Sequence, residues 1–416
     1  MLLRNYSLHS TLAVQALGSL ATLLLGLLIA WFQGPQAQGH YGVVRSTADL
    51  LLAIALLGLP QGVVHLLNHE RIRPQALYAA LSRYVCGVAL LGLIMAASRV
   101  SGVLPGGLRE PEVMLALAAG VTGWVVHGLQ RAFVLCLGST AAFSWLTAAP
   151  ALTLLMASIV LLAAGSHRYE WALAASGAAS ALWGALLVAR LRTQPGWHRG
   201  SKLRWQKLIS FGGHSTVQTV SMALQPWLAL WLLQHFGASP AELGWFVIAG
   251  YVLQVFVLPA NFVTPLIMAR ASNAAGAGKS FDISRRLREV GMLALIGCLA
   301  AAAALPFSVP LVLGDAYRPA IGPCVWMAAA GPAVLIGRLA TALLLGRGSF
   351  QAVTLLFVLR VGLTALGIWL AATGKLQPLD RVTAAAASWA LAEVIIAACL
   401  AALARPFQAP NGGNRS

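Results

Sequence analysis

Long runs of apolar residues alternate with short polar connections along the whole chain. Each run has about 20 residues, the length that an α-helix needs to cross the ~30 Å hydrocarbon core of a membrane. Lipid offers backbone groups no water to bind, so a spanning segment must be helical or part of a closed barrel. Because the runs are rich in Leu, Ala and Gly, we predict an all-α, polytopic membrane protein. The twelve predicted spans are residues 11–32, 42–66, 76–98, 112–130, 138–164, 171–189, 208–235, 243–268, 289–313, 320–345, 350–372 and 382–404.

The composition excludes an ordinary soluble protein. Apolar residues make up 59% of the 416 residues and charged residues only 9%, too few to cover a surface that faces water. The solvent of this chain is therefore largely lipid.

Two segments of the chain align without a gap. Residues 9–68 match residues 214–273 at an offset of 205 (214 − 9). The matching positions include His9 and His214, Pro35 and Pro240, Gly39 and Gly244, and Pro60 and Pro265. We interpret the repeated Pro-x-x-x-Gly as a turn between spans. An offset near half the chain predicts two lobes of six helices, and the even number makes them parallel.

The predicted organisation follows from this repeat. It consists of an N-terminal lobe at 1–189, a basic connector at 190–207, a C-terminal lobe at 208–404 and a short tail at 405–416. The connector has two possible roles. It can fix the topology, with Trp197 and Trp205 as interfacial anchors, or it can capture an anionic lipid directly.

The positive-inside rule orients the chain. Placing both termini in the cytoplasm puts most Arg and Lys residues of the connections inside, including Arg71, Arg131, Arg190 and Arg347. The net charge of +17 is then mostly cytoplasmic, where anionic membrane lipids are its expected partners, and nucleic-acid binding is not needed to explain it.

The sequence contains no pattern for a cofactor or a metal. The five cysteines fall inside predicted spans without a CxxC spacing, and no Walker A loop is present. We expect no disulfide, no metal site, no cofactor and no direct use of ATP.

Four stretches carry a resemblance to a known family. They are GPQAQGHYGVVRSTADLLLAIALLGLPQGVV at 34–64, WQKLISFGGHSTVQ at 205–218, LGWFVIAGYVLQVFVLPANFVTPLIMARAS at 243–272 and VPLVLGDAYRPAIGPCVWM at 309–327. Together they resemble the polysaccharide flippases, of the O-antigen type, in the multidrug/oligosaccharidyl-lipid/polysaccharide exporter superfamily. The resemblance implies a MATE-like fold in a bacterial inner membrane. It also implies a transporter, not an enzyme, that turns an undecaprenyl-diphosphate-linked oligosaccharide to the outer leaflet by alternating access. A polysaccharide polymerase and a chain-length regulator are the protein partners that it suggests.

Polar residues inside the spans are the candidates for substrate contact. His214, Gln218, Ser221 and Gln225 follow one another at helical spacing, and Thr11, Gln15, Ser19 and Thr22 form a similar row in the first span. These rows fit either a cavity wall that contacts sugar or hydrogen bonds between helices.

Arg45 and Asp49 are one helical turn apart in the second span, near its predicted outer end. At the offset of 205 they correspond to Gly250 and Gln254, so the charges do not belong to the repeated scaffold. A structural ion pair, a phosphate or sugar contact by Arg45, and a titrating Asp49 that couples an ion all remain open.

In the second lobe, Arg360 and Glu393 both lie near the middle of the bilayer, and Arg338 is shallower. Two positive charges and one negative leave an excess cation, which would attract a diphosphate. Alternatively, Arg360 and Glu393 pair with each other and Arg338 reaches toward the cytoplasm. Glu393 is also a candidate for a coupling proton.

Three functions compete. The first is a flippase for O-antigen or exopolysaccharide units. The second is a cation-coupled small-molecule or multidrug antiporter of the same superfamily, against which the cationic bias argues. The third is a membrane polysaccharide polymerase or ligase, which would be expected to expose a large outer domain.

Overall fold

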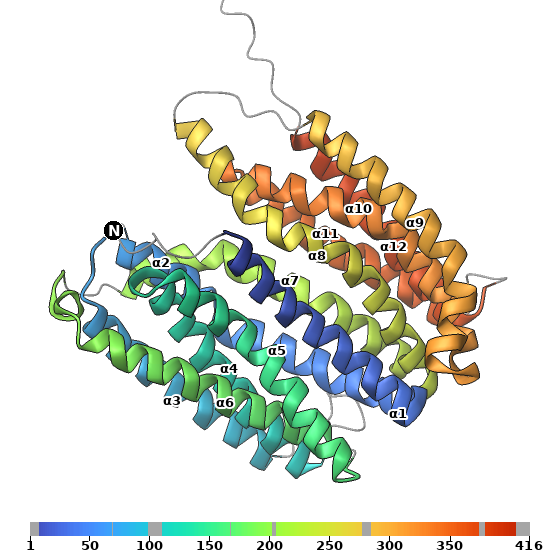
Figure 1. The fold of residues 1–416 in the computed structure, drawn as a ribbon, viewed down its shortest axis with the longest axis horizontal. Helices are drawn as coiled ribbons and strands as arrows, with labels where there is room; N and C mark the ends of the chain where they lie inside the picture. Colours follow the sequence, from blue (N-terminus) through green and yellow to red (C-terminus); the bar gives the residue numbers. More distant parts are fainter. Residues whose placement is uncertain are drawn as a thin grey trace, which may run out of the picture. The chain divides into compact units, whose positions relative to one another are not determined.

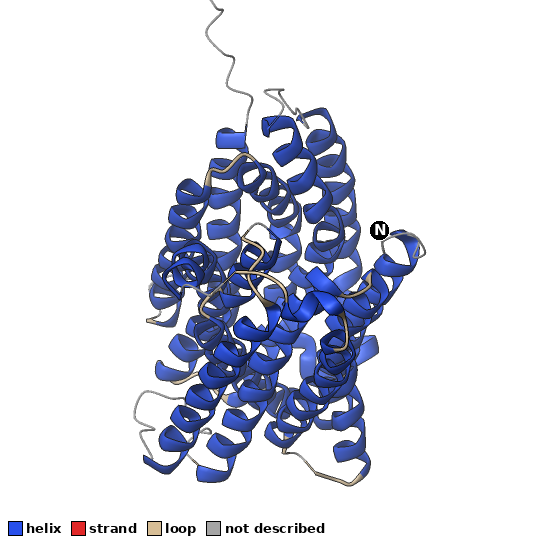
Figure 2. Ribbon diagram, turned by 90° about the vertical axis from the view of Figure 1, so that its left-hand side faces the viewer, coloured by secondary structure: helices blue, strands red, loops and turns tan. Residues whose placement is uncertain are grey.

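The computed structural model describes residues 8–68, 70–98, 110–166, 168–201, 205–276, 284–373 and 379–404. Within these ranges every regular element is a helix (Figure 2), apart from one isolated bridge between Ile72 and Ser201. The α-helices are α1 (Leu8–Leu56), α2 (Leu59–Asn68), α3 (Pro74–Ser98), α4 (Pro111–Leu137), α5 (Thr140–Ala163), α6 (Tyr169–Arg192), α7 (Trp205–His235), α8 (Pro240–Gly276), α9 (Ser284–Leu313), α10 (Ile321–Gly346), α11 (Phe350–Ala372) and α12 (Arg381–Ala404). Two short 3-10 helices, η2 (Pro195–His198) and η3 (Asp315–Ala320), precede α7 and α10.

These helices confirm the predicted fold class. In the described part of the chain, 10 segments are long and apolar enough to cross a membrane, and the first of them, Ala13–Asn68, has 56 residues. At ~1.5 Å per residue this segment is more than twice as long as one crossing requires, so it contains the first two predicted spans. The more polar α7 is not among the ten.

The chain reverses direction inside α1 at a single residue (Figure 1). Gly34 has φ 78 and ψ −175, a conformation that glycine adopts without steric cost. Helix resumes at Pro35, whose missing N–H is tolerated in a first turn. The predicted connection at 33–41 is therefore wrong. The second span begins at Pro35, and the repeated Pro-x-x-x-Gly is a first helical turn in both copies, since Pro240 likewise begins α8.

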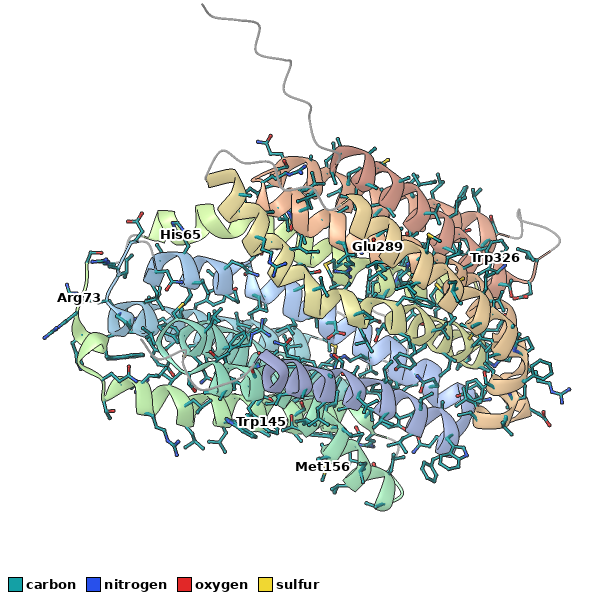
Figure 3. All side chains as sticks on the ribbon, turned by 45° about the horizontal axis from the view of Figure 1, so that its top comes forward. His65, Arg73, Trp145, Met156, Glu289 and Trp326 are labelled. Atoms are coloured by element: carbon teal, nitrogen blue, oxygen red, sulfur yellow. The ribbon has the colours of Figure 1, made fainter. Side chains whose placement is uncertain are left out.

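Large apolar side chains cover the outside of the helices, as a lipid-facing surface requires. Trp145 and Met156 on α5 and Trp326 on α10 are exposed by 37%, 60% and 42% and project from the ribbon (Figure 3). Buried small residues, by contrast, dominate α10 and α12, which pack against each other. The outer surface of the helices is therefore apolar, as contact with lipid requires.

Contacts divide the chain into two compact units, Met1–Val247 and Ile248–Ser416. In the first unit, α4 packs on α6, α5 packs on α1 and α6, and α7 packs on α1 and α2. In the second, α10 packs on α9 and α12, and α11 packs on α12. The division falls after the first turns of α8, whereas we predicted a boundary at 190–207, so the two six-helix lobes stay a prediction.

The basic connector docks on the start of α3. Ser201 donates its N–H to the carbonyl oxygen of Arg71 and accepts the N–H of Arg73, both at 3.1 Å. Trp197 is only 4% exposed and packs on the Tyr78 ring, over which Arg192 stacks at 4.4 Å. The expectation of an interfacial anchor at Trp197 is therefore wrong, because a side chain so fully buried is part of the core; the Trp205 side chain lies outside the described residues.

The two copies of the Pro-x-x-x-Gly turn touch each other within the first unit. A Cβ added at Gly39 would lie 2.0 Å from the carbonyl oxygen of Pro240, and one added at Gly244 would lie 2.0 Å from that of Pro35. The contact is reciprocal, since each glycine faces the proline of the other copy. Glycine at both positions allows the two backbones to approach this closely.

We expect Gly39→Ala to lower the melting temperature of the detergent-purified protein by several degrees. The new methyl group has only backbone against it and must push α1 and the start of α8 apart, at a cost of about 1–3 kcal/mol. The matched control is Gly250→Ala on α8, where an added Cβ meets nothing within 4 Å. Equal melting temperatures for the two variants would contradict the close approach.

Candidate functional site

The first unit contains a cavity of about 260 Å³ that is lined by five helices. α1, α2, α4, α5 and α7 contribute to its wall. The lining residues are Arg45, Leu52, Leu56, Gly58, Pro60, Gln61, Trp124, His127, Gly128, Arg131, Thr147, Pro150 and Thr219. We call this space the basic cavity, because its three ionisable residues are two arginines and a histidine.

Arg45 occupies one part of the basic cavity and forms the expected ion pair. Its Nε donates to Asp49 Oδ2 at 2.9 Å, and its guanidinium lies 4.8 Å from the centre of the Trp124 ring. Asp49 itself does not line the cavity. Arg45 is ten residues (45 − 35) past Pro35, or about 15 Å along the helix. Arg45 therefore lies deeper within its helix than predicted, because the helix begins seven residues before the predicted span (42 − 35), and its depth in the membrane stays a prediction.

α4 presents three cavity residues on one face. Trp124, His127 and Arg131 are spaced three and four residues apart, which places them above one another along about 10 Å of helix. Hydrogen bonds to α6 orient the side chains of Trp124 and His127. Trp124 Nε1 donates to Ser176 Oγ at 3.3 Å, and His127 Nδ1 is 3.3 Å from the carbonyl oxygen of Ser180. A carbonyl only accepts, so this contact places the ring proton of a neutral His127 on Nδ1.

Arg131 is the arginine of the basic cavity that forms no ion pair among the described residues. It is half-buried, and its guanidinium lies 5.8 Å from the centre of the Phe143 ring. In the described part of the chain no carboxylate forms an ion pair with it and no hydrogen bond is made by its side chain. A guanidinium offers five N–H donors in a planar fork that matches phosphate oxygens. Arg131 is thus a preformed donor for an anion.

The remaining polar groups of the wall contribute mainly acceptors. Thr147 donates its hydroxyl to the carbonyl oxygen of Phe143 at 2.8 Å, and Thr219 donates to that of Ser215 at 2.8 Å. Each hydroxyl proton is used inside its own helix, which leaves oxygen lone pairs for a ligand. Gln61 adds an amide. The described wall contains no Asp or Glu, so the cavity favours a negatively charged ligand.

A second charged cluster lies in the second unit. Arg338 of α10, Arg360 of α11 and Glu393 of α12 line one cavity of about 20 Å³. Arg360 Nη1 is 3.7 Å from Glu393 Oε2, and the two residues are 8% and 6% exposed. Arg360 also lies 5.0 Å from the centre of the Phe357 ring. The expected pair of Arg360 and Glu393 is present, and its cavity is too small for a diphosphate in this conformation.

Among the residues whose side chains the structure describes, no member of the polar rows on the first and seventh spans lines the basic cavity. On α7, Gln225 is buried and Gln218 half-buried, while Thr219 is the residue that lines the wall. Gln15 on α1 is half-buried and does not line it. The His214 side chain lies outside the described residues. A sugar-binding role for these rows stays a prediction.

Sequence reasoning missed the three residues on α4. From the sequence, Arg131 was assigned only to the positive charge of the cytoplasmic connections. In the structure it lies within α4, six residues (137 − 131) before the C-terminal end of that helix. The signal in the sequence is the spacing of Trp124, His127 and Arg131 on one face of a span, where two basic groups lie a turn apart. That pattern marks one polar face of α4 as a candidate for substrate contact.

Solved structures resemble this chain over nearly its whole length. An inward-facing multidrug resistance MATE family transporter of the MOP superfamily superposes with a TM-score of 0.75 at 12% identity, covering 96% of this chain and 98% of the other. The chain has the MATE fold. The Vibrio cholerae MATE transporter VcmN covers 95% of both chains, with a TM-score of 0.65 and 17% identity. The lipid II flippase MurJ, in an inward closed conformation, covers 95% of this chain and 87% of its own, with a TM-score of 0.70 and 9% identity.

At the level of sequence, no protein-family model and no curated relative matches the chain. The likeness is therefore one of fold, that of a multi-pass membrane protein. Multidrug transporters and a lipid flippase both have the MATE fold, so the chemistry of the cavity has to separate them.

Proposed function

We propose that this protein is a flippase that carries an undecaprenyl-diphosphate-linked oligosaccharide, an O-antigen or exopolysaccharide unit, to the outer leaflet of a bacterial inner membrane. The observation that carries the proposal is the basic cavity, with Arg45, His127 and Arg131 in its wall and no described acidic residue. Transport by alternating access fits the MATE fold. Anionic lipids, a polymerase and a chain-length regulator are the proposed partners.

The diphosphate is the part of the substrate that the basic cavity fits. A volume of about 260 Å³ is just below the range of ~300–1,000 Å³ typical of small-molecule sites. It has room for a diphosphate and not for a whole oligosaccharide. Arg45 of α1 stacks on Trp124, and Arg131 lies seven residues (131 − 124) further along α4, a rise of about 10 Å, so two phosphate groups can each meet a guanidinium. Such charge-assisted hydrogen bonds are stronger in a site that excludes water.

A multidrug exporter of cationic compounds is the competing function, and the fold alone does not exclude it. A cationic drug would enter a space with two arginines and no described carboxylate, where like charges repel it. Asp49 offsets the charge of Arg45, with which it pairs, but the positive charge of Arg131 in the same wall has no acidic partner among the described residues. The cavity therefore supports an anionic substrate.

Reconstituted transport tests the proposal directly. Proteoliposomes holding the purified full-length protein receive a fluorescent undecaprenyl-diphosphate oligosaccharide, and a membrane-impermeant quencher reports how much reaches the other leaflet. We expect the protein to accelerate this movement at least tenfold over empty liposomes. Ethidium transport is measured in the same vesicles. Transport of ethidium without movement of the lipid would replace the flippase by a multidrug exporter.

A test in cells separates substrate choice from reconstitution. We expect deletion of the gene to remove the surface glycan while lipid-linked repeat units accumulate in the inner leaflet. Unchanged surface glycan together with altered drug resistance would contradict the proposal.

A further inference from the structure

Another cavity of the first unit lies where α4 ends, α5 begins and α6 ends, and its volume is about 260 Å³. It shares no lining residue with the basic cavity. Its wall is largely apolar and includes Val134, Leu137, Leu187 and Leu191. Its polar side chains, Ser139, Arg190 and Gln194, are all exposed and form a rim at the helix ends. We call this space the helix-end cavity.

The polar rim offers hydrogen-bond donors and no negative charge. The guanidinium of Arg190 forms no ion pair and no hydrogen bond with a described residue, and the side-chain amide of Gln194 is equally without a described partner. Ser139 Oγ accepts the N–H of Ala142 at 3.2 Å, which leaves its hydroxyl proton for a ligand. Since the described wall contains no Asp or Glu, the rim favours an anion.

The side of α6 that carries Arg190 continues into a lipid-facing surface. Leu182, Leu186 and Arg190 follow one another at intervals of four residues and so share one side of the helix. The two leucines are 63% and 61% exposed. Two exposed tryptophans, which favour the membrane interface, lie at a similar distance from the rim. Trp183 is seven residues (190 − 183) before Arg190, and Trp145 is five residues (145 − 140) after the start of α5, or about 10 Å and 8 Å.

We propose that the helix-end cavity binds the headgroup of an anionic phospholipid, on the side of the membrane that we predict to be cytoplasmic. The headgroup phosphate accepts hydrogen bonds from Arg190, Gln194 and Ser139, and an acyl chain lies along Leu186 and Leu182. Phosphatidylethanolamine would bring an ammonium group to a rim that has no described carboxylate, whereas phosphatidylglycerol brings only hydroxyl groups. The site gives the proposed partnership with anionic lipids one location, and it does not depend on what the protein transports.

Native mass spectrometry of the purified full-length protein tests the site. Phosphatidylglycerol and phosphatidylethanolamine with identical acyl chains are titrated separately, and we expect the first phosphatidylglycerol to bind about tenfold more tightly. Equal dissociation constants for the two lipids overturn the proposal. Glycerol 3-phosphate is the soluble probe with the same phosphate chemistry, and a large excess should not displace the lipid. Displacement would identify the occupant as a soluble anion and would also overturn the proposal.

Three variants test the location of the lipid. Arg190→Gln removes the only charge of the rim and should weaken phosphatidylglycerol binding about tenfold, while the exposed position leaves folding intact. Arg199→Gln is the matched control, because Arg199 is exposed just after η2, lies outside the cavity and changes the net charge equally; it should bind normally. Ala142→Leu fills part of the cavity without changing the charge and should also weaken binding. Equal losses in the two arginine variants, or normal binding by Ala142→Leu, overturn the assignment.

Discussion

Replacing Arg131 with glutamine is expected to reduce movement of the diphosphate-linked lipid by tenfold to a hundredfold. A hydrogen bond to a charged group contributes about 1.5–3 kcal/mol, and Arg131 is the cavity arginine without an acidic partner in the described structure. All of its binding capacity can therefore be directed at the substrate. The measurement is the initial rate of fluorescence quenching in proteoliposomes, compared at equal protein content.

The controls separate loss of binding from loss of folding. Arg131→Gln removes a half-buried charge that has no acidic partner, so its melting temperature should stay the same or rise. Arg131→Lys keeps the charge but not the planar fork, and we expect partial activity. Arg168→Gln removes an arginine whose exposed side chain pairs with Glu112 outside the cavity, and it should leave transport unchanged. Full activity of Arg131→Gln would remove the residue from the site.

Replacing Glu393 with glutamine should destabilise the protein by about 3–5 kcal/mol. The change leaves Arg338 and Arg360 buried around one cavity without the carboxylate that faces them. We expect low abundance in the membrane and a clear drop in melting temperature after purification. The double variant Arg360→Gln/Glu393→Gln removes one charge of each sign and should recover most of the loss.

The single and double variants also define the results that would contradict this prediction. If Glu393→Gln has the melting temperature of the unchanged protein, the carboxylate does not hold the cluster together. If the single and double variants lose the same stability, the two residues act independently, and the coupling that a 3.7 Å pair implies is absent.

Most of the helical architecture was predictable because lipid imposes a simple rule on the sequence. Each crossing needs an apolar run of limited length, and the ends of α3, α10, α11 and α12 agree with the predicted spans within about two residues. The predicted connection at 33–41 failed for a local reason. The stretch QGPQAQGH at 33–40 is polar enough to predict a loop, yet only Gly34 leaves the helical conformation, and Pro35 is compatible with a helix start as well as with a loop.

The candidate site was only partly predictable. The pair of Arg45 and Asp49 follows from their spacing on one helix, and the meeting of Arg360 with Glu393 follows from their equal depth. The basic cavity required knowledge of which helices are neighbours. Arg45 meets Trp124 because α1 packs against α4, and the sequence gives no periodic signal for that choice of partner.

The reciprocal contact between Pro35–Gly39 and Pro240–Gly244 has the geometry of a two-fold dimer interface, in which residue i meets j and j meets i. A half-length ancestor of about 205 residues would make this contact between two identical copies. Gene duplication and fusion then keep the interface while freeing each copy to diverge. Arg45 is an example, because the equivalent residue in the other copy is Gly250. In a single chain one copy can carry a charge that the other lacks, whereas a homodimer carries every residue twice.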